Sequence, residues 1–380
     1  MEFTLEIVLY GSIAMLVYTY LGYPLLLAMW ARCGSIPVRK SKTTPSVTIV
    51  IAAWNEALRI KERVIDCLAQ EYPVECLNVV VVSDGSTDGS VEMVKTISSS
   101  RVKLVVLENK MGKAVALNHG VMAADGEIIV FTDARQKFSP TAVRELVQNF
   151  TDPTVGAVTG ELVLEESLDK RRRSHAGGLY WKVEKWIRKN EGAIDSVIGA
   201  TGAIYAIRRS LYNSLPPGTI LDDLLTPMQI AMRGLRVVFE ARALAYDVVP
   251  SSYRAEFSRK VRTLAGNYQA ISLCPDLLVP WRNRLFFQFM SHKVCRLVAP
   301  ICMMTLLLAN LWLWSGWLEL LFAAQIAGYG LALIGWRLRI MGIHDRWTSP
   351  VFTFCMLNVA AVLGAIQFFR SRAISWEKTT

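Results

Sequence analysis

The sequence is poor in charged residues, histidine and paired cysteines. Charged side chains make up 19% of the 380 residues, whereas soluble domains average about 25%. The seven cysteines form no CxxC pair and no dense pattern, which excludes a disulfide scaffold and indicates reduced thiols. The four histidines are scattered without ligand spacing, so we assign them no metal. The apolar share of 52% excludes a disordered chain and predicts that part of the chain lies in a membrane.

The charges that are present are mostly basic. Lys and Arg number 42 against 32 Asp and Glu, which gives a net charge of +10. An excess of this kind suits anionic lipid headgroups, phosphorylated substrates or nucleic acid. No nucleic-acid recognition motif is present, so we expect no nucleic-acid partner. At roughly 150 residues per domain, the length allows two to three folding units.

The first long apolar run covers residues 7–31 and predicts an N-terminal transmembrane anchor over residues 1–31. The run has no charged residue and is long enough to cross about 30 Å of hydrocarbon. Acidic residues precede it and basic residues follow it, which favours a retained anchor whose C-terminal flank lies in the cytoplasm. A cleaved signal peptide is the alternative, but it would begin with basic residues and have a shorter apolar region.

Two further apolar regions predict three more spans over residues 297–370. Residues 297–336 are too many for one span, and Ser315 and Gly316 suit the turn of a helical hairpin. Residues 351–369 form the next uncharged run. This count places the C-terminus outside, although the basic tail argues against it. We expect an integral protein of a bacterial plasma or inner membrane, with residues 45–250 in the cytoplasm.

Residues 253–296 separate the middle of the chain from these spans. They carry eight Lys and Arg against two acids, with aromatic residues between them. The pattern predicts amphipathic helices that lie on the cytoplasmic leaflet. An ordinary solvated helix face is the alternative interpretation.

Residues 45–250 predict an α/β domain. Short runs rich in Val and Ile alternate with helical patterns, which is typical of a parallel sheet covered on both faces. Such sheets bind ligands at the carboxyl ends of their strands. The expected strands are Val47–Ala52, Val79–Val82, Leu104–Leu107 and Ile128–Thr132, and the expected helices are Glu56–Tyr72, Asp88–Ser98, Lys113–Ala124 and Pro140–Phe150.

Charged residues follow these strand ends, namely Asp84, Asp88, Lys113 and Asp133. A carboxylate there can bind a ribose, a base edge or a divalent cation, and a lysine that begins a helix suits a phosphate. Together they predict a pocket for a nucleoside diphosphate. The chain has no GxxxxGK[ST] and no GxGxxG sequence, which argues against P-loop and dinucleotide sites. Each residue taken alone is also explained as a turn or helix-cap residue.

These segments resemble a known family. VTIVIAAWNE, SDGSTDGS, NKMGKAVALNHG and IIVFTDA resemble the nucleotide-binding half of family 2 glycosyltransferases, which have a Rossmann-like GT-A fold. GLYWKVEKWIRKNEG, GATGAIYAIRRSLY, ILDDL and RKVRT look like the acceptor half of the membrane-embedded members, which are the cellulose, chitin, hyaluronan and poly-N-acetylglucosamine synthases. The resemblance covers roughly residues 45–300. It implies a cytosolic α/β GT-A domain with flanking transmembrane and interfacial helices.

The resemblance implies a role for each matching residue. It implies Asp223 as the general base with Asp222 beside it, and Asp133 as the ligand of Mg²⁺ or Mn²⁺. The residues that it implies for the UDP-sugar donor are Ala53, Glu56, Asp84, Lys113, Asp133, Arg259 and Arg262. The residues that it implies for the acceptor are Tyr180, Trp181, Thr201, Gly202 and Ala203.

Three positions depart from the family's pattern. Arg135 replaces the second Asp of the D-x-D element, which removes one metal ligand and places a cation beside the diphosphate. Asp222 replaces the Glu of the Glu-Asp pair, which is a mild change. Thr263 replaces the Trp of the R-x-x-R-W element, whose ring stacks on the acceptor sugar in the family. The type of acceptor therefore stays open.

The resemblance implies an inverting hexosyltransferase. Such an enzyme would move a sugar from UDP-GlcNAc or UDP-glucose to a growing β-linked polysaccharide and pass the product through its spans, with accessory export subunits as further partners. One alternative is the transfer of a single sugar to a lipid-linked acceptor. Another is a non-catalytic membrane subunit that binds nucleotide sugars, for which Arg135 is the only support.

Overall fold

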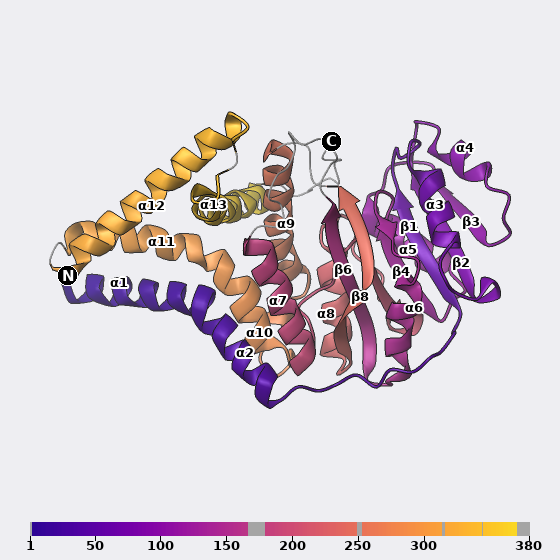
Figure 1. The fold of residues 1–380 in the computed structure, drawn as a ribbon, viewed down its shortest axis with the longest axis horizontal. Coiled ribbons are helices and arrows are strands. Elements are labelled where there is room, and N and C mark those ends of the chain that lie inside the picture. Colours follow the sequence, from indigo (N-terminus) through magenta and orange to yellow (C-terminus); the bar gives the residue numbers. More distant parts are fainter. Residues whose placement is uncertain (1, 166–178, 249–252, 314–315, 344, 371–380) are drawn as a thin grey trace.

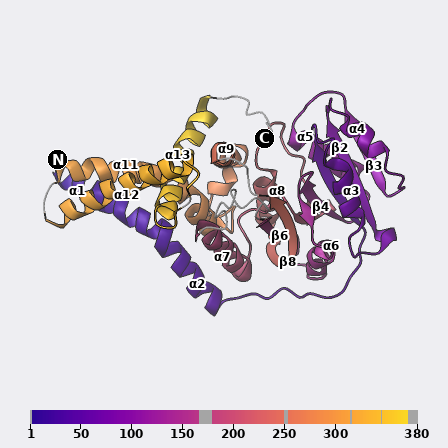
Figure 2. The ribbon, with the colours of Figure 1, turned by 45° about the horizontal axis from the view of Figure 1, so that its top comes forward.

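The structure is a computed structural model that describes residues 2–165, 179–248, 253–313, 316–343 and 345–370 (Figure 1). It has an α/β unit on one side and a group of long apolar helices on the other (Figures 1 and 2). The expected α/β GT-A architecture is confirmed. The expected turn at Ser315 and the basic tail after residue 370 lie outside the described residues.

The α/β unit is built on one eight-stranded sheet with the order β3-β2-β1-β4-β7-β6-β8-β5. The strands are β1 Val47–Ala53, β2 Leu77–Asp84, β3 Val102–Leu107, β4 Ile128–Asp133, β5 Lys137–Phe138, β6 Val155–Glu165, β7 Tyr205–Arg208 and β8 Arg236–Val248. The first four strands pair in parallel, as expected. The second half of the sheet departs from this pattern, because β7 pairs antiparallel with both β4 and β6.

Helices cover both faces of this sheet. Alternate residues of β1 point to opposite faces, so Ile49 and Ile51 pack with α3, α4 and α6, whereas Val50 packs with α5 and α8. A strand buried on both faces needs apolar residues at successive positions, which explains the sequence VTIVIAA. These helices are α3 Ile60–Leu68, α4 Ser90–Lys95, α5 Lys113–Ala123, α6 Ala142–Val147 and α8 Asp222–Met232, with short 3₁₀ turns η2 Val74–Cys76, η3 Gln148–Thr151 and η5 Arg209–Leu211.

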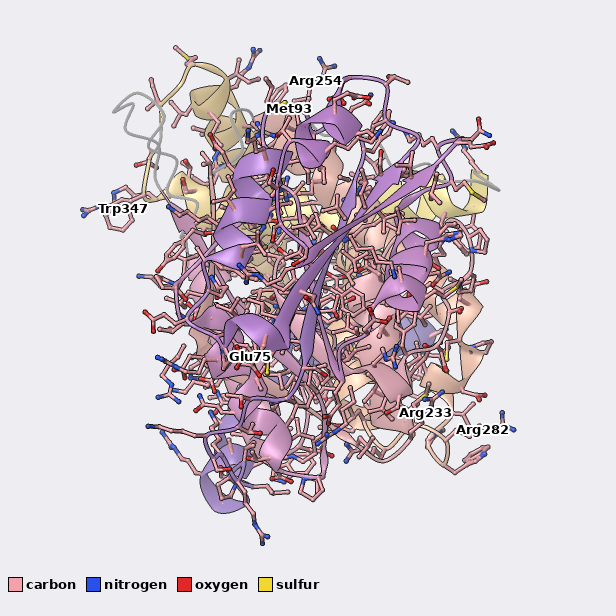
Figure 3. All side chains as sticks on the ribbon, turned by 90° about the vertical axis from the view of Figure 1, so that its right-hand side faces the viewer. Glu75, Met93, Arg233, Arg254, Arg282 and Trp347 are labelled. Atoms are coloured by element: carbon pink, nitrogen blue, oxygen red, sulfur yellow. The ribbon has the colours of Figure 1, made fainter. Side chains whose placement is uncertain are left out.

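Two helices join the sheet to the apolar helices. α7 Leu179–Ile194 packs against the N-terminal helix and β8, and α9 Tyr253–Leu273 packs against the last helix. A 3₁₀ turn, η6 Pro275–Leu278, follows α9. The exposed charged residue Glu75 lies on the face of the sheet unit that is turned toward the viewer in Figure 3, on the side opposite the long helices. The α/β unit therefore has a hydrated outer side and a side that faces the apolar helices.

Four helical segments are long and apolar enough to cross a membrane. They are Phe3–Cys33, Phe286–Trp312, Trp317–Ile340 and Thr348–Arg370. The first segment comprises α1 Glu2–Val17, the π-helical turn η1 Tyr18–Gly22 and α2 Tyr23–Cys33. The second comprises α10 Phe286–Phe289, the π-helical turn η7 Met290–Val294 and α11 Cys295–Trp312. The third is α12 Trp317–Ile340 and the fourth is α13 Thr348–Arg370. Their outward apolar side chains, among them Leu25, Leu320 and Leu333, are more than 60% exposed, which indicates membrane association.

The four helices do not share one direction. α1, α11 and α12 extend away from the sheet across the view of Figure 1, whereas α13 is seen along its axis and lies crosswise to them (Figures 1 and 2). α13 packs closely on α9, because a Cβ at Gly364 would lie 2.9 Å from the backbone nitrogen of Ala265. This contact holds α13 over the side of the α/β unit that faces the membrane helices.

We predict that Gly364→Leu lowers the unfolding free energy of the protein, because the added side chain must push α13 away from α9. Overpacking of this kind costs roughly 1–3 kcal/mol of unfolding free energy. The measurement is thermal unfolding of the detergent-solubilised protein. Gly330→Leu in α12 is the matched control, since a Cβ at that position meets nothing within 4 Å. Equal unfolding temperatures for the two variants would contradict the contact.

Candidate active site

The candidate site lies at the carboxyl edge of the parallel half of the sheet. In the strand register, Ala52 of β1 is opposite Asp133 of β4, and Ala53 is opposite Ser83 of β2. The strands therefore end side by side, as the sequence predicts. Two helices begin at this edge, with Lys113 as the first residue of α5 and Asp222 as the first residue of α8.

Lys113 links the two carboxylates that lie nearest the centre of the site. Its ammonium nitrogen is 3.0 Å from Asp133 Oδ1 and 3.0 Å from Asp222 Oδ1. Burial alone would lower the pKa of Lys113, but the surrounding carboxylates raise it above its ordinary value. Burial alone would raise the pKa of Asp133, but Lys113 and Arg135 hold it below its ordinary value. Both groups are therefore charged at neutral pH and neutralise each other.

Asp223 differs from Asp222 in its surroundings. Asp222 is 3% exposed and accepts a hydrogen bond from Tyr205 Oη at 3.2 Å, whereas Asp223 is partly exposed in the pocket and accepts one from the Gly202 backbone nitrogen at 3.0 Å. Burial and the neighbouring charge of Asp222 raise the pKa of Asp223 to about 6. A carboxylate with this pKa is ionised at neutral pH yet accepts a proton readily.

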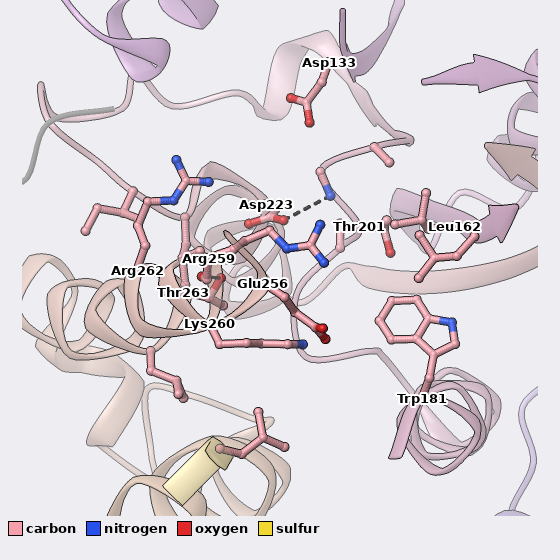
Figure 4. Close-up of a pocket in the computed structure, with 18 of the residues that line it drawn as sticks. Asp133, Leu162, Trp181, Thr201, Asp223, Glu256, Arg259, Lys260, Arg262 and Thr263 are labelled. Carbon is pink, nitrogen blue, oxygen red and sulfur yellow. Dashed lines mark hydrogen bonds between the residues drawn. The ribbon is translucent and has the colours of Figure 1, made fainter. Parts of the chain in front are cut away.

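One cavity of about 1700 Å³ joins these groups to the apolar helices. In Figure 4, Asp133 lies at one end of the pocket and Lys260 at the other, with Asp223 between them. The cavity brings together most of the residues predicted from the sequence, namely Glu56, Lys113, Asp133, Trp181, Thr201, Gly202, Ala203, Asp222, Asp223, Arg259 and Arg262. Thr263, where the family has a Trp, also lines it.

Asp84 and Ala53 are close to this cavity but do not line it. Asp84 is fully buried, and its two carboxylate oxygens accept hydrogen bonds from the backbone nitrogens of Met111 at 2.7 Å and Gly112 at 2.9 Å. Asp84 therefore fixes the loop that leads into Lys113. Tyr180 is the second residue of α7, but its side chain lies outside the described part of the structure.

Arg135 is held by the second half of the sheet. Its Nε lies 3.2 Å from Asp247 Oδ2 at the end of β8, and Gln136 donates to the same oxygen at 3.0 Å. The described residues include no group of three His, Cys, Asp or Glu that could hold a metal ion alone. Mg²⁺ and Mn²⁺ are commonly bound by one or two carboxylates together with substrate phosphates. Asp133 fits a divalent cation that arrives with a diphosphate.

Two further pocket residues were not predicted from the sequence. Arg188 of α7 donates to Thr201 Oγ1 at 2.6 Å, so a cation lies beside the segment expected to meet the acceptor. Lys110 Nζ lies 3.4 Å from the centre of the Trp54 ring at the other end of the pocket. Both residues lie within sequence segments already identified, but only the fold shows that they face the cavity.

A buried ionic cluster lies behind the acceptor side of the pocket. His292 of η7 has its Nδ1 2.7 Å from Glu191 and its Nε2 2.6 Å from Glu184, both on α7. Tyr23 of α2 donates to Glu191 at 2.7 Å, and Arg296 donates to Glu184 at 2.6 Å. Both ring nitrogens of His292 thus face a glutamate carboxylate. The cluster joins the first apolar helix, the second and α7.

Comparisons with known proteins agree with this geometry. Residues 48–215 match the model of the family "Glycosyl transferase family 2". The chain is 24% identical over 235 residues to a poly-beta-1,6-N-acetyl-D-glucosamine synthase of Staphylococcus aureus (strain COL), which is 59% of this chain and 55% of that protein. It is 22% identical over 275 residues to the synthase of the same name from Staphylococcus epidermidis, which is 66% of this chain and 65% of that protein. The matches thus span between half and two thirds of these relatives.

A solved structure resembles the whole chain. A mannosyltransferase from Pyrobaculum calidifontis, in complex with GDP-Man and Mn²⁺, superimposes with a TM-score of 0.74 at 24% identity, over 96% of this chain and 99% of that one. This likeness shows that the membrane helices as well as the α/β unit follow a known arrangement. The motif segments, the family match and the fold lead to the same conclusion: residues 48–215 are a family 2 glycosyltransferase region, the chain has a GT-A fold, and it is a distant homologue of poly-β-1,6-N-acetylglucosamine synthase.

Proposed function

We propose that the enzyme moves a sugar from a UDP-sugar, UDP-GlcNAc or UDP-glucose, to an acceptor hydroxyl at the membrane surface, with inversion at the anomeric carbon. The observation that carries the proposal is Asp223, a carboxylate with a raised pKa that shares one cavity with the charged groups around Lys113. Its position beside Gly202 gives it access to an acceptor in the cavity. Asp222 holds Lys113 in place and is a positioning residue.

The reaction is one displacement. The acceptor oxygen attacks the anomeric carbon, the bond from that carbon to the diphosphate oxygen breaks, and the proton of the hydroxyl passes to Asp223. The leaving diphosphate takes the electron pair, and Arg259, Arg262 and Lys113 lie in the cavity to neutralise it. A divalent cation bound at Asp133 would supply further positive charge to the same group. A single displacement on an α-linked donor gives a β-linked product.

Elongation of a β-linked polysaccharide is the second candidate function. The similarity to poly-beta-1,6-N-acetyl-D-glucosamine synthases favours it. The mannosyltransferase binds GDP-Man, so a donor panel should contain UDP-GlcNAc, UDP-glucose and GDP-mannose. Nucleotide release with each donor identifies the donor, and the size of the product separates a polymer from single transfer.

We predict that Asp223→Asn lowers the rate of nucleotide release by about 10²–10⁴-fold, because an amide cannot accept the proton. UDP affinity should be unchanged, since the cations that surround the diphosphate remain. Both quantities are measured on the purified protein in detergent. Asp125→Asn, an exposed site far from the cavity lining, is the control and should turn over normally. Normal turnover by Asp223→Asn would refute the base assignment.

The raised pKa of Asp223 predicts an acidic limb in the pH profile. Below about pH 6 the carboxyl is protonated, so kcat/KM should fall about tenfold per pH unit. Asp222→Asn removes the neighbouring negative charge and lowers the pKa of Asp223, so the limb should move to lower pH. A limb that stays in place in Asp222→Asn would show that another group titrates.

We predict that Mn²⁺ or Mg²⁺ tightens UDP binding through Asp133. Titration of UDP with and without EDTA should show tighter binding by the metal-loaded wild type, and Asp133→Asn should remove most of this difference because the ion loses its only protein carboxylate. Asp125→Asn should respond as the wild type does. An equal metal response in Asp133→Asn and wild type would place the ion elsewhere.

A further inference from the structure

The cavity continues beyond Asp223 into the apolar helices. Its far wall contains Tyr20 of η1 and a face of α13 that includes Phe354, Leu357 and Asn358. The volume of about 1700 Å³ exceeds the roughly 300–1,000 Å³ of a site for one drug-sized ligand. A nucleotide sugar at the Asp133 end therefore leaves room for a second ligand between Asp223 and α13.

The charge of the cavity also exceeds what the donor needs. Eleven Lys and Arg and six Asp and Glu line it among the described residues, which is an excess of five positive charges. Asp247 and Glu184, which lie outside the lining, pair with Arg135 and Arg296 and reduce this excess from five to three, and the two phosphates of a nucleotide sugar neutralise only part of the remainder. Lining cations without an anionic ligand are costly when they are removed from water. The excess of positive charge predicts that the cavity binds a second anionic ligand besides the nucleotide sugar.

Three of these cations lie at the membrane end, on three different helices. Lys260 belongs to α9, and burial together with Arg259 lowers its pKa. Arg296 is the second residue of α11 and is paired with Glu184. Arg339 lies in the last turn of α12, 4.6 Å from the centre of the Phe352 ring, and its Nε has no hydrogen-bond partner among the described residues. Cations from three helices thus line this part of the cavity, and they share it with Glu256 of α9, whose carboxylate acts on both Lys260 and Arg339.

The neighbours of these cations distinguish between acceptors. A neutral polysaccharide adds no negative charge to this basic part of the cavity, and the ring that would stack on it is replaced by Thr263. A lipid that bears phosphate satisfies the cations with its headgroup and the apolar face of α13 with its tail. Arg339 stands in the last turn of α12, at the helix end expected on the cytoplasmic side, the level at which lipid phosphates lie.

We propose that the membrane end of the cavity binds the phosphate or pyrophosphate of a lipid-linked saccharide and presents its sugar hydroxyl to Asp223. This inference rests on the proposed transfer function and names its acceptor. The hydroxyl oxygen forms the new glycosidic bond and its proton goes to Asp223. The donor's bond to the diphosphate breaks, and the nucleoside diphosphate leaves with the electron pair. The lipid phosphate is not consumed; it anchors the acceptor.

The transfer experiment uses the full chain in nanodiscs with three acceptors that carry the same sugar. They are polyprenyl-pyrophosphoryl-GlcNAc, an uncharged alkyl β-GlcNAc glycoside and a soluble chito-oligosaccharide, each tested with the three-donor panel. We expect the wild type to prefer the pyrophosphoryl lipid at least tenfold in kcat/KM, and Arg339→Gln to lose about tenfold for that acceptor alone, since a charge-assisted hydrogen bond is lost. Arg337→Gln, an exposed position in the same helical turn outside the cavity lining, should keep the preference. Equal use of the three acceptors would overturn the inference.

A binding experiment separates this inference from the proposed function. Retention of polyprenyl pyrophosphate is measured by native mass spectrometry of protein released from nanodiscs, without donor, for wild type, Lys260→Gln, Arg339→Gln and Arg337→Gln. If the lipid site exists, wild type and Arg337→Gln should retain polyprenyl pyrophosphate, whereas Lys260→Gln and Arg339→Gln should lose it. Retention with no nucleotide release from any donor would refute the transfer function but keep the lipid site. Equal retention by all four proteins would refute the lipid site, whatever the enzyme transfers.

Discussion

The active site depends on the charge balance around one buried ammonium group. Three carboxylates, Asp133, Asp222 and Asp223, come within reach of Lys113, and no arrangement of these acids alone could be buried at this edge of the sheet. Lys113 joins the end of β4 to the start of α8 and is itself the first residue of α5. The parallel half of the sheet, which ends in Asp133, and the helix that begins with Asp222 and Asp223 are thereby fixed relative to each other.

The two neighbouring acids, Asp222 and Asp223, differ because of this charge balance around Lys113. Asp222 pairs with Lys113 and Tyr205 and holds the lysine in place. Asp223 meets a backbone nitrogen and the cavity, and burial together with the negative charge next to it raises its pKa. Two adjacent residues of the same type thus have different contacts because their surroundings differ. The substitution of the family's Glu by Asp222 is compatible with this arrangement, since the carboxylate reaches the lysine.

The first four strands and most pocket residues could be predicted from the sequence, because buried parallel strands are continuous Val/Ile runs that end in polar residues. The second half of the sheet could not: β6 and β8 are long, irregularly paired strands, and the antiparallel β7 between β4 and β6 has only four residues. The inward position of Asp84 also escaped prediction, because its partners are backbone nitrogens that no side-chain pattern reveals. The ionic contacts of His292 could not be predicted either, because its two glutamate partners lie about a hundred positions away in the sequence.

The ionic cluster around His292 ties the first apolar helix to the interior of the protein. Tyr23, on the first apolar helix, supplies a donor to a glutamate that is 1% exposed. Cutting the α/β unit free of its N-terminal helix would leave that carboxylate short of a partner in a dry environment, at a cost of about 1–3 kcal/mol. The anchor is therefore part of the enzyme's own interior rather than a tether, and trimming the chain to obtain a water-soluble transferase would remove a piece of its core.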